Sequence, residues 1–129
     1  MKTAVLILLL NPLTIEPGLL FHRFVDDAAA SKGITDVAVI VCAKPAANTF
    51  LARSQFNHHI QRVIIREDVL ATASPRLLRY LAFHEVCHIY LWRSEQPDTE
   101  DDVDVCVRRM LWSRDEWGRA IVERDAWRP

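Results

Sequence analysis

The segment YLAFHEVCHIYL, residues 80–91, constrains this chain more than any other part of the sequence, because it is apolar apart from His84, Glu85 and His88. Residues four apart lie on one face of a helix, so the two imidazoles would lie one turn apart. At that separation both can bind one Zn²⁺, with Glu85 beside the metal, where it can take a proton from a zinc-activated water. We predict His84 and His88 as metal ligands and Glu85 as a general base.

An ordinary helix that happens to carry three polar residues is the alternative. Apolar side chains such as Phe83, Val86 and Ile89 surround the three positions. Burying a charge among such neighbours without a partner costs free energy, and a metal ion would supply the partner. The pattern therefore favours a metal site.

A zinc site with two histidines and a water needs one more protein ligand. The next predicted helix, residues 98–112, carries an apolar stripe of Val103, Val107, Met110 and Leu111. At about 100° per residue, Glu100 falls on the side of this stripe and Asp104 on its flank. We predict Glu100 as an inward-facing third ligand and Asp104 as an acceptor for the outer nitrogen of a ligand histidine. Asp104 and Asp101 remain alternative ligands. The opposite side of this helix would carry Asp98, Asp101 and Asp102, which suit the helix dipole.

The other elements follow from hydrophobic periodicity and from helix-end and turn signals. We predict helices over residues 17–31 and 75–93, and a last helix that starts at a capping box of Ser113 and Glu116. Strands are predicted over residues 4–10, 36–43, 49–56 and 61–68, with a tight connection at residues 57–60. This order predicts a single α+β domain over residues 1–129.

The composition argues against nucleic-acid and membrane partners. The net charge of −1 creates no global field. Residues 4–10 are too few to span a bilayer, and a buried strand explains them as simply as a short signal peptide does. Cys42, Cys87 and Cys106 are an odd number without C-x-x-C spacing, which predicts unpaired, buried thiols and a cytoplasmic protein, with secretion as the minor alternative.

The C-terminal segment contains Trp112, Trp117 and Trp127 among arginines. Interleaved acidic residues cancel most of the positive charge of this segment. We therefore predict that these tryptophans pack on the core, or on a second subunit of a homo-oligomer, and do not stack on nucleic-acid bases.

The sequence HEVCH at residues 84–88, followed by EDDVD at residues 100–104, resembles the zincin metallopeptidases. Among them it is most similar to the gluzincins and to the minimal ImmA/IrrE-like peptidases. The resemblance implies a zincin-like domain with a mostly antiparallel sheet of about three to four strands, the H-E-x-x-H helix and a glutamate helix. It also implies that His84, His88 and Glu100 bind Zn²⁺ and that Glu85 is the general base. Twelve residues separate His88 from Glu100, fewer than in most gluzincins.

By the same resemblance, the strand at residues 49–56 would be an edge to which an extended protein or peptide substrate adds. Candidate donors to the oxyanion are Tyr80, Tyr90, His58 and His59, although the two last lie in a segment that reads as a solvated turn. The predicted function is a zinc-dependent metallopeptidase. The alternative is a catalytically inactive zinc-binding domain of the same fold that regulates or binds a partner.

Overall fold

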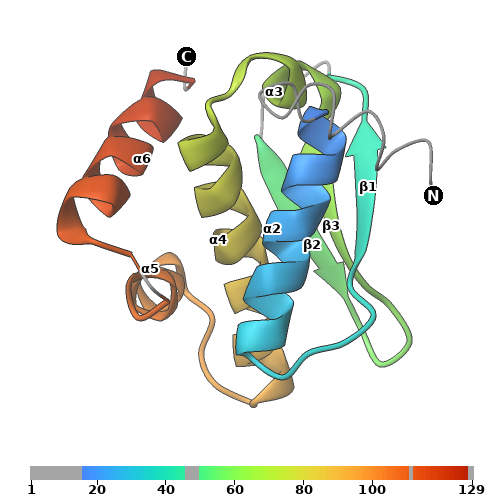
Figure 1. The fold of residues 1–129 in the computed structure, drawn as a ribbon. Coiled ribbons are helices and arrows are strands. Elements are labelled where there is room, and N and C mark those ends of the chain that lie inside the picture. Colours follow the sequence, from blue (N-terminus) through green and yellow to red (C-terminus); the bar gives the residue numbers. More distant parts are fainter. Residues whose placement is uncertain (1–15, 46–49, 111, 128–129) are drawn as a thin grey trace.

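The computed structural model describes residues 16–45, 50–110 and 112–127 (Figure 1). Its helices are α2 (Pro17–Ser31), α3 (Glu67–Thr72), α4 (Pro75–Arg93), α5 (Glu100–Arg108) and α6 (Arg114–Ala126). Its strands are β1 (Ala38–Cys42), β2 (Ala52–Phe56) and β3 (Gln61–Arg66). The strand predicted at residues 4–10 lies outside the described residues, as do position 49 of the predicted edge strand and position 111 of the apolar stripe.

Local signals at the helix ends act as the sequence predicts. Pro17 starts α2, and Gly33 follows its end with a φ of 68°, in the left-handed region that glycine adopts without strain. Ser74 caps α4 by accepting a hydrogen bond from the backbone N–H of Leu77. The predicted bounds of α2 and α4 are therefore confirmed. Ser113 likewise caps α6 by accepting from the N–H of Glu116.

The three strands form a mixed sheet in the order β1–β3–β2. Strand β2 pairs with β3 antiparallel, as predicted, whereas β1 pairs with β3 parallel. The α+β class is confirmed. Strand β2 lies at an edge of this sheet and beside α4.

The core lies between the sheet and the helices α2 and α4, which both cover the same face (Figure 1). Its fully buried members include Phe21, Val25, Val63, Ile65, Leu77, Val86 and Ile89. Helices α5 and α6 pack on α4; α5 adds Val103 and Val107 to the core, and α6 adds Ala120. Within the described ranges, no helix has the length and apolar character needed to cross a membrane.

Strand β3 is shorter than predicted, because a short helix begins where the strand was expected to continue. Arg66, with 1 % of its surface exposed, ends β3 and pairs with Asp68 in α3 at 2.9 and 2.5 Å. This pairing holds the pKa of Asp68 below its usual range. The Arg66 guanidinium also donates to the carbonyl of Phe50 over 2.8 Å, which ties the segment before β2 to the end of β3.

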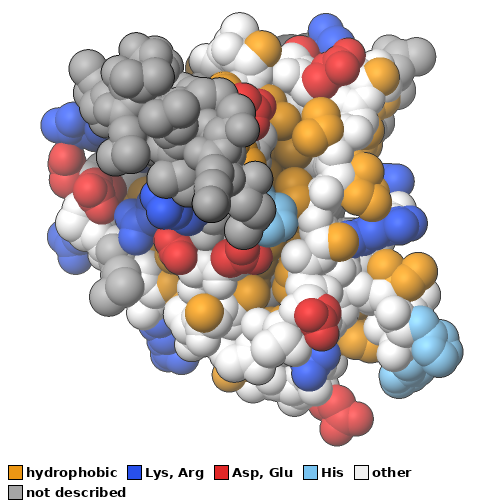
Figure 2. Space-filling view, turned by 45° about the vertical axis from the view of Figure 1, so that its right-hand side comes forward, with side chains coloured by type: hydrophobic (Ala, Val, Ile, Leu, Met, Phe, Trp, Pro, Cys, Tyr) orange, Lys and Arg blue, Asp and Glu red, His pale blue; other side chains and the backbone are white. Residues whose placement is uncertain are grey.

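The tryptophans near the C-terminus are packed on their own chain. Trp112, Trp117 and Trp127 are each partly buried against the core, which is the first of the two predicted packings, while packing on a second subunit stays a prediction. The guanidinium of Arg79 lies 4.5 Å from the Trp112 ring centre, in the geometry of a cation–π contact. On the face seen in Figure 2, acidic and basic side chains are interspersed, in keeping with the small net charge.

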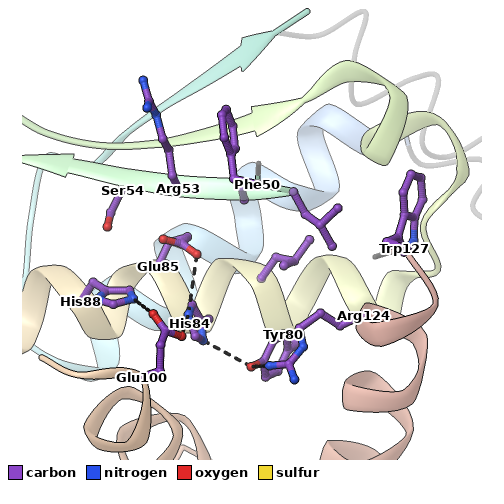
Figure 3. A pocket seen from close by; sticks show the side chains of 13 residues that line it. Phe50, Arg53, Ser54, Tyr80, His84, Glu85, His88, Glu100, Arg124 and Trp127 are labelled. Carbon is purple, nitrogen blue, oxygen red and sulfur yellow. Dashed lines mark hydrogen bonds and ion pairs between the residues drawn. The ribbon is translucent and has the colours of Figure 1, made fainter. Parts of the chain in front are cut away.

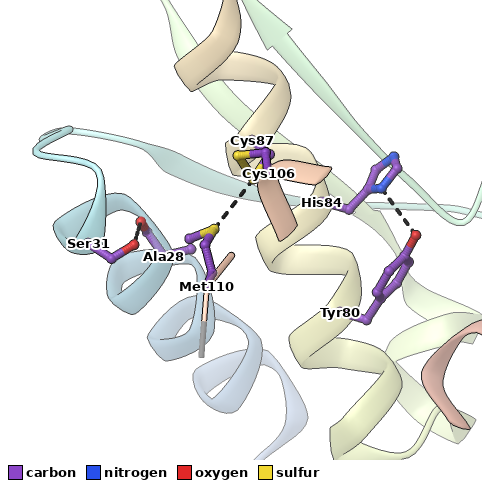
Figure 4. The surroundings of a disulfide bond; sticks show 7 residues. All are labelled: Ala28, Ser31, Tyr80, His84, Cys87, Cys106 and Met110. Carbon is purple, nitrogen blue, oxygen red and sulfur yellow. Dashed lines mark hydrogen bonds between the residues drawn. A yellow bond between two sulfur atoms is a disulfide. The ribbon is translucent and has the colours of Figure 1, made fainter. Parts of the chain in front are cut away.

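The prediction for two of the cysteines is wrong. Cys87 in α4 and Cys106 in α5 form a disulfide with their Cα atoms 6.0 Å apart (Figure 4). Both are buried, and Met110 packs against them with its sulfur 3.4 Å from that of Cys87. Cys42 is a free, half-buried thiol. The expectation of a cytoplasmic protein depended partly on unpaired cysteines, and this bond removes that support.

We expect the disulfide to contribute about 3 kcal/mol to the free energy of unfolding, because it closes a chain segment with a sequence separation of 19. A reductant should lower the thermal midpoint of the wild type but not that of the Cys87→Ala/Cys106→Ala variant. The Cys42→Ala variant, as a control, should respond to reductant as the wild type does. Titration of the unreduced, denatured wild type should find one thiol among its three cysteines; three thiols would contradict the bond.

Candidate functional site

A hollow of about 440 Å³ lies between the edge strand β2 and helix α4, and helices α5 and α6 close its sides (Figure 3). Its lining includes residues 50–54 from the β2 segment and Tyr80, Leu81, His84, Glu85 and His88 from α4. Glu100 of α5, Arg124 of α6 and Trp127, which follows α6, complete the lining. All three residues of the H-E-x-x-H pattern therefore face one hollow beside a strand edge.

His84, His88 and Glu100 converge on one point at this hollow. The Nε2 atom of His84 lies 3.2 Å from Glu100 Oε2, and the Nε2 atom of His88 lies 3.3 Å from Glu100 Oε1. One ligand atom from each of the three residues lies within 4.8 Å of the others. The helical spacing of α4 places the imidazoles one turn apart, with ring centres separated by 5.0 Å. Two imidazoles and a carboxylate are a donor set that zinc accepts in open sites.

Glu100 faces the histidines but not the core. The sequence predicted that the Glu100 carboxylate faces the core, whereas 73 % of the Glu100 side chain is exposed. The difference arises because Glu100 is the first residue of α5, after the cap Thr99, and lies at the open mouth of the hollow. At that position a side chain can face α4 while most of its surface stays exposed. Asp101, the neighbouring alternative, is exposed and does not belong to the converging group.

The outer nitrogens of both histidines also have oxygen partners. His84 Nδ1 lies 3.3 Å from the hydroxyl of Tyr80, and His88 Nδ1 lies 3.6 Å from Asp98. Asp104, predicted as the acceptor for a ligand histidine, lies 3.5 Å from the Tyr80 hydroxyl and so reaches His84 through that group. Asp98 precedes α5, so the helical angle that placed it on the opposite side does not apply.

Glu85 is buried next to the converging group. Only 6 % of its surface is exposed, and its Oε2 lies 3.9 Å from His84 Nε2. Burial raises the pKa of Glu85 to about 7, although the nearby His84 and hydrogen bonds from Ser54 of β2 oppose the rise. A carboxylate with a pKa near neutrality is suited to proton transfer. Ser54 and Glu85 lie opposite each other across the hollow in Figure 3.

The charges around the histidines favour a bound cation. Hydrogen bonding to His84 lowers the pKa of Glu100 to about 2. Burial alone would lower the pKa of His84, but Glu100, Glu85 and Asp104 outweigh it, and the pKa is raised. Three carboxylates around one imidazole attract positive charge, and a divalent metal satisfies that attraction as a proton does.

Other predicted candidates lie elsewhere. His58 and His59 are exposed in the turn between β2 and β3, where the Asn57 side chain accepts from the N–H groups of His59 and Ile60. The turn is confirmed, and neither histidine lines the hollow. Tyr90 is partly buried under Lys32, whose Nζ lies 4.6 Å from its ring centre. Among the described residues, Tyr80 alone of the four oxyanion candidates lines the hollow.

The sequence did not point to Arg124 or Trp127 as site residues. They lie in and just after α6, whose position depends on a tertiary contact. Glu123 accepts hydrogen bonds from the backbone N–H and the hydroxyl of Ser74 at the start of α4. This contact brings Arg124 within 2.8 Å of the Tyr80 hydroxyl. No periodicity or spacing links residues 80 and 124, so only the fold could reveal the pair.

Comparison with known proteins identifies the fold. No model of a protein family matches this chain, and no curated protein matches it either. Its structure is similar to the crystal structure of the metallopeptidase zymogen of Methanocaldococcus jannaschii jannalysin, with a TM-score of 0.59. The sequences are 14 % identical, and the match covers 80 % of this chain and 85 % of that chain. The chain therefore has a metallopeptidase-like fold.

Proposed function

We propose that this protein is a zinc-dependent peptidase of the gluzincin type, with His84, His88 and Glu100 as metal ligands. The observation that carries the proposal is the convergence of the two Nε2 atoms and the Glu100 carboxylate beside buried Glu85. Zn²⁺ held there would lower the pKa of a water molecule and polarise a carbonyl oxygen. Two nitrogens and one oxygen leave a coordination position open, as catalytic zinc sites do.

Glu85 would move the proton in this reaction. Its carboxylate lies on the hollow side of α4 and is close to the ligand atoms. It can accept a proton from the attacking water and later donate it to the leaving amine. Burial raises the pKa of Glu85 to about 7 in the protein without metal, and a carboxyl group in so apolar a position can hold a proton as well as release it.

The strand edge supplies a place for the substrate. Strand β2 is at the edge of the sheet and forms one wall of the hollow, opposite α4. An extended peptide that pairs with this edge would place a carbonyl between the strand and Glu85. The hydrogen bond from the Arg66 guanidinium to the Phe50 carbonyl restrains the segment that precedes β2. We therefore propose a protein or peptide in extended conformation as the substrate.

Metal analysis and a cleavage assay on one preparation test the proposal. The purified chain should contain one zinc per molecule and should cleave members of a mixed peptide library, with cleavage lost on chelation and restored by zinc. Stoichiometric zinc without cleavage would favour an inactive zinc-binding partner domain. A correctly folded chain that takes up no zinc would contradict both functions.

A further inference from the structure

The hydroxyl group of Tyr80 lies where side chains from three helices meet. Arg124 Nη1 from α6 donates to it over 2.8 Å. His84 Nδ1 lies 3.3 Å away on α4, and Asp104 Oδ1 lies 3.5 Å away on α5. Tyr80 is fully buried, and the Arg124 side chain is 20 % exposed. Figures 3 and 4 both show the tyrosine hydroxyl directed at the imidazole.

The chemistry of the partners sets the direction of each hydrogen bond. A hydroxyl has one proton and two lone pairs. Arginine can only donate, so Arg124 occupies one lone pair of the Tyr80 oxygen. An ionised carboxylate can only accept, so the hydroxyl proton is directed to Asp104. One lone pair remains, and an Nδ1–H of His84, 3.3 Å away, can fill it.

When a metal ion takes the place of the proton on Nε2, a neutral imidazole that keeps its proton on Nδ1 presents the Nε2 lone pair to the metal. In His84 the Nε2 atom faces Glu100 over 3.2 Å at the converging group. The equivalent partner of His88 is Asp98, which is about half exposed and lies 3.6 Å from the ring. His84 is thus the histidine whose orientation is set by buried groups.

We propose that Tyr80 and Arg124 are positioning residues that hold His84 as the Nδ1–H tautomer with its Nε2 lone pair directed at the metal. This inference rests on the zinc site of the proposed function. It gives α6 a role in the site, because Glu123 anchors this helix to Ser74 while the adjacent Arg124 orients Tyr80. It also assigns Tyr80 a role other than oxyanion donor, since its proton and both lone pairs are engaged within the protein.

The Tyr80→Phe variant tests this role by removing only the hydroxyl. Partners of metal-bound histidines typically contribute 10–100-fold to metal affinity, so we expect zinc to bind at least about 10-fold more weakly, measured by competition with a chromophoric chelator. Arg124→Met should weaken binding in the same direction, and Arg124→Lys, which keeps a donor, should weaken it less. Tyr90→Phe is the matched control on the same helix, because Tyr90 does not line the hollow, and it should bind zinc as the wild type does.

A second readout separates positioning from a general loss of structure. In long-range proton–nitrogen spectra of the zinc-loaded wild type, His84 should show a slowly exchanging proton on Nδ1. This proton should exchange rapidly in Tyr80→Phe, while the thermal midpoint of the metal-free variant stays close to that of the wild type. A Tyr80→Phe protein with unchanged zinc affinity, or an Nδ1 proton that exchanges equally slowly in both proteins, would overturn the inference.

The outcomes also distinguish this inference from the proposed function. The affinity measurement contains no peptide, so a wild type that binds zinc through the chain but cleaves nothing would refute the peptidase alone. A wild type with no affinity for zinc would refute both. Weakened binding in Tyr80→Phe with peptidase activity in the wild type supports both.

Discussion

The Glu85→Gln variant should lose peptide cleavage by about 10³-fold while it retains stoichiometric zinc. A positioned general base contributes about 10²–10⁴-fold to a rate, and glutamine cannot accept the proton of the attacking water. Glutamine matches glutamate in size, so the buried position beside His84 and Ser54 remains filled. Turnover of a peptide that the wild type cleaves, measured alongside zinc content, checks this result.

The matched control for this variant is Glu95→Gln, which makes the same charge change at an exposed position just after α4. Glu95 does not line the site hollow, so its variant should cleave peptide at the wild-type rate. Equal activity in Glu85→Gln and the wild type would rule out Glu85 as the base. Loss of zinc together with activity would show that Glu85 acts on the metal site and not on the water.

The His84→Ala and His88→Ala variants should each lose zinc. Removing a partner of a ligand typically lowers metal affinity 10–100-fold, so removing the ligand itself should exceed about 10²-fold. Alanine supplies no donor atom, and Glu100 with one imidazole cannot complete a zinc site. Dialysis against a weak chelator followed by elemental analysis should find zinc in the wild type and none in either variant. Cleavage should disappear with the metal.

His59→Ala is the control for these variants, because His59 is exposed in the β2–β3 turn and does not belong to the converging group. Its zinc content should equal that of the wild type. If His84→Ala kept full zinc occupancy, the ligand set proposed here would be wrong. Circular dichroism of the metal-free variants distinguishes loss of the ligand from loss of the fold.

Helices whose ends are set by residues adjacent in the sequence were predictable. Pro17 and Gly33 bound α2 because one suits a first helical turn and the other a left-handed φ. Helix α4 has its predicted bounds, with Ser74 as the cap. Strand β3 ended early because buried Arg66 pairs with the partly exposed Asp68 at the start of α3, and an alternating pattern does not show such a pair.

Contacts between helices account for what sequence reasoning missed. Cys87 and Cys106 are separated by 19 in sequence, and their pairing depends on how closely α5 packs on α4. Glu100 was predicted to face the core because its helical angle falls near the centre of the apolar stripe that includes Val103 and Val107. The helical angle indicated which side of α5 carries Glu100, and on that side the carboxylate faces α4. The angle did not indicate burial, because Glu100 lies at the open mouth of the hollow.

The sequence alone determined the face of α4 that carries His84, Glu85 and His88, because a helix repeats every 3.6 residues whatever surrounds it. Only the tertiary structure decided which groups meet that face. Glu100 arrives from α5, Ser54 contributes from β2, and Arg124 arrives from α6 through Tyr80. These contacts join residues far apart in the chain, and their distances depend on the packing of whole helices and strands, which local periodicity does not encode.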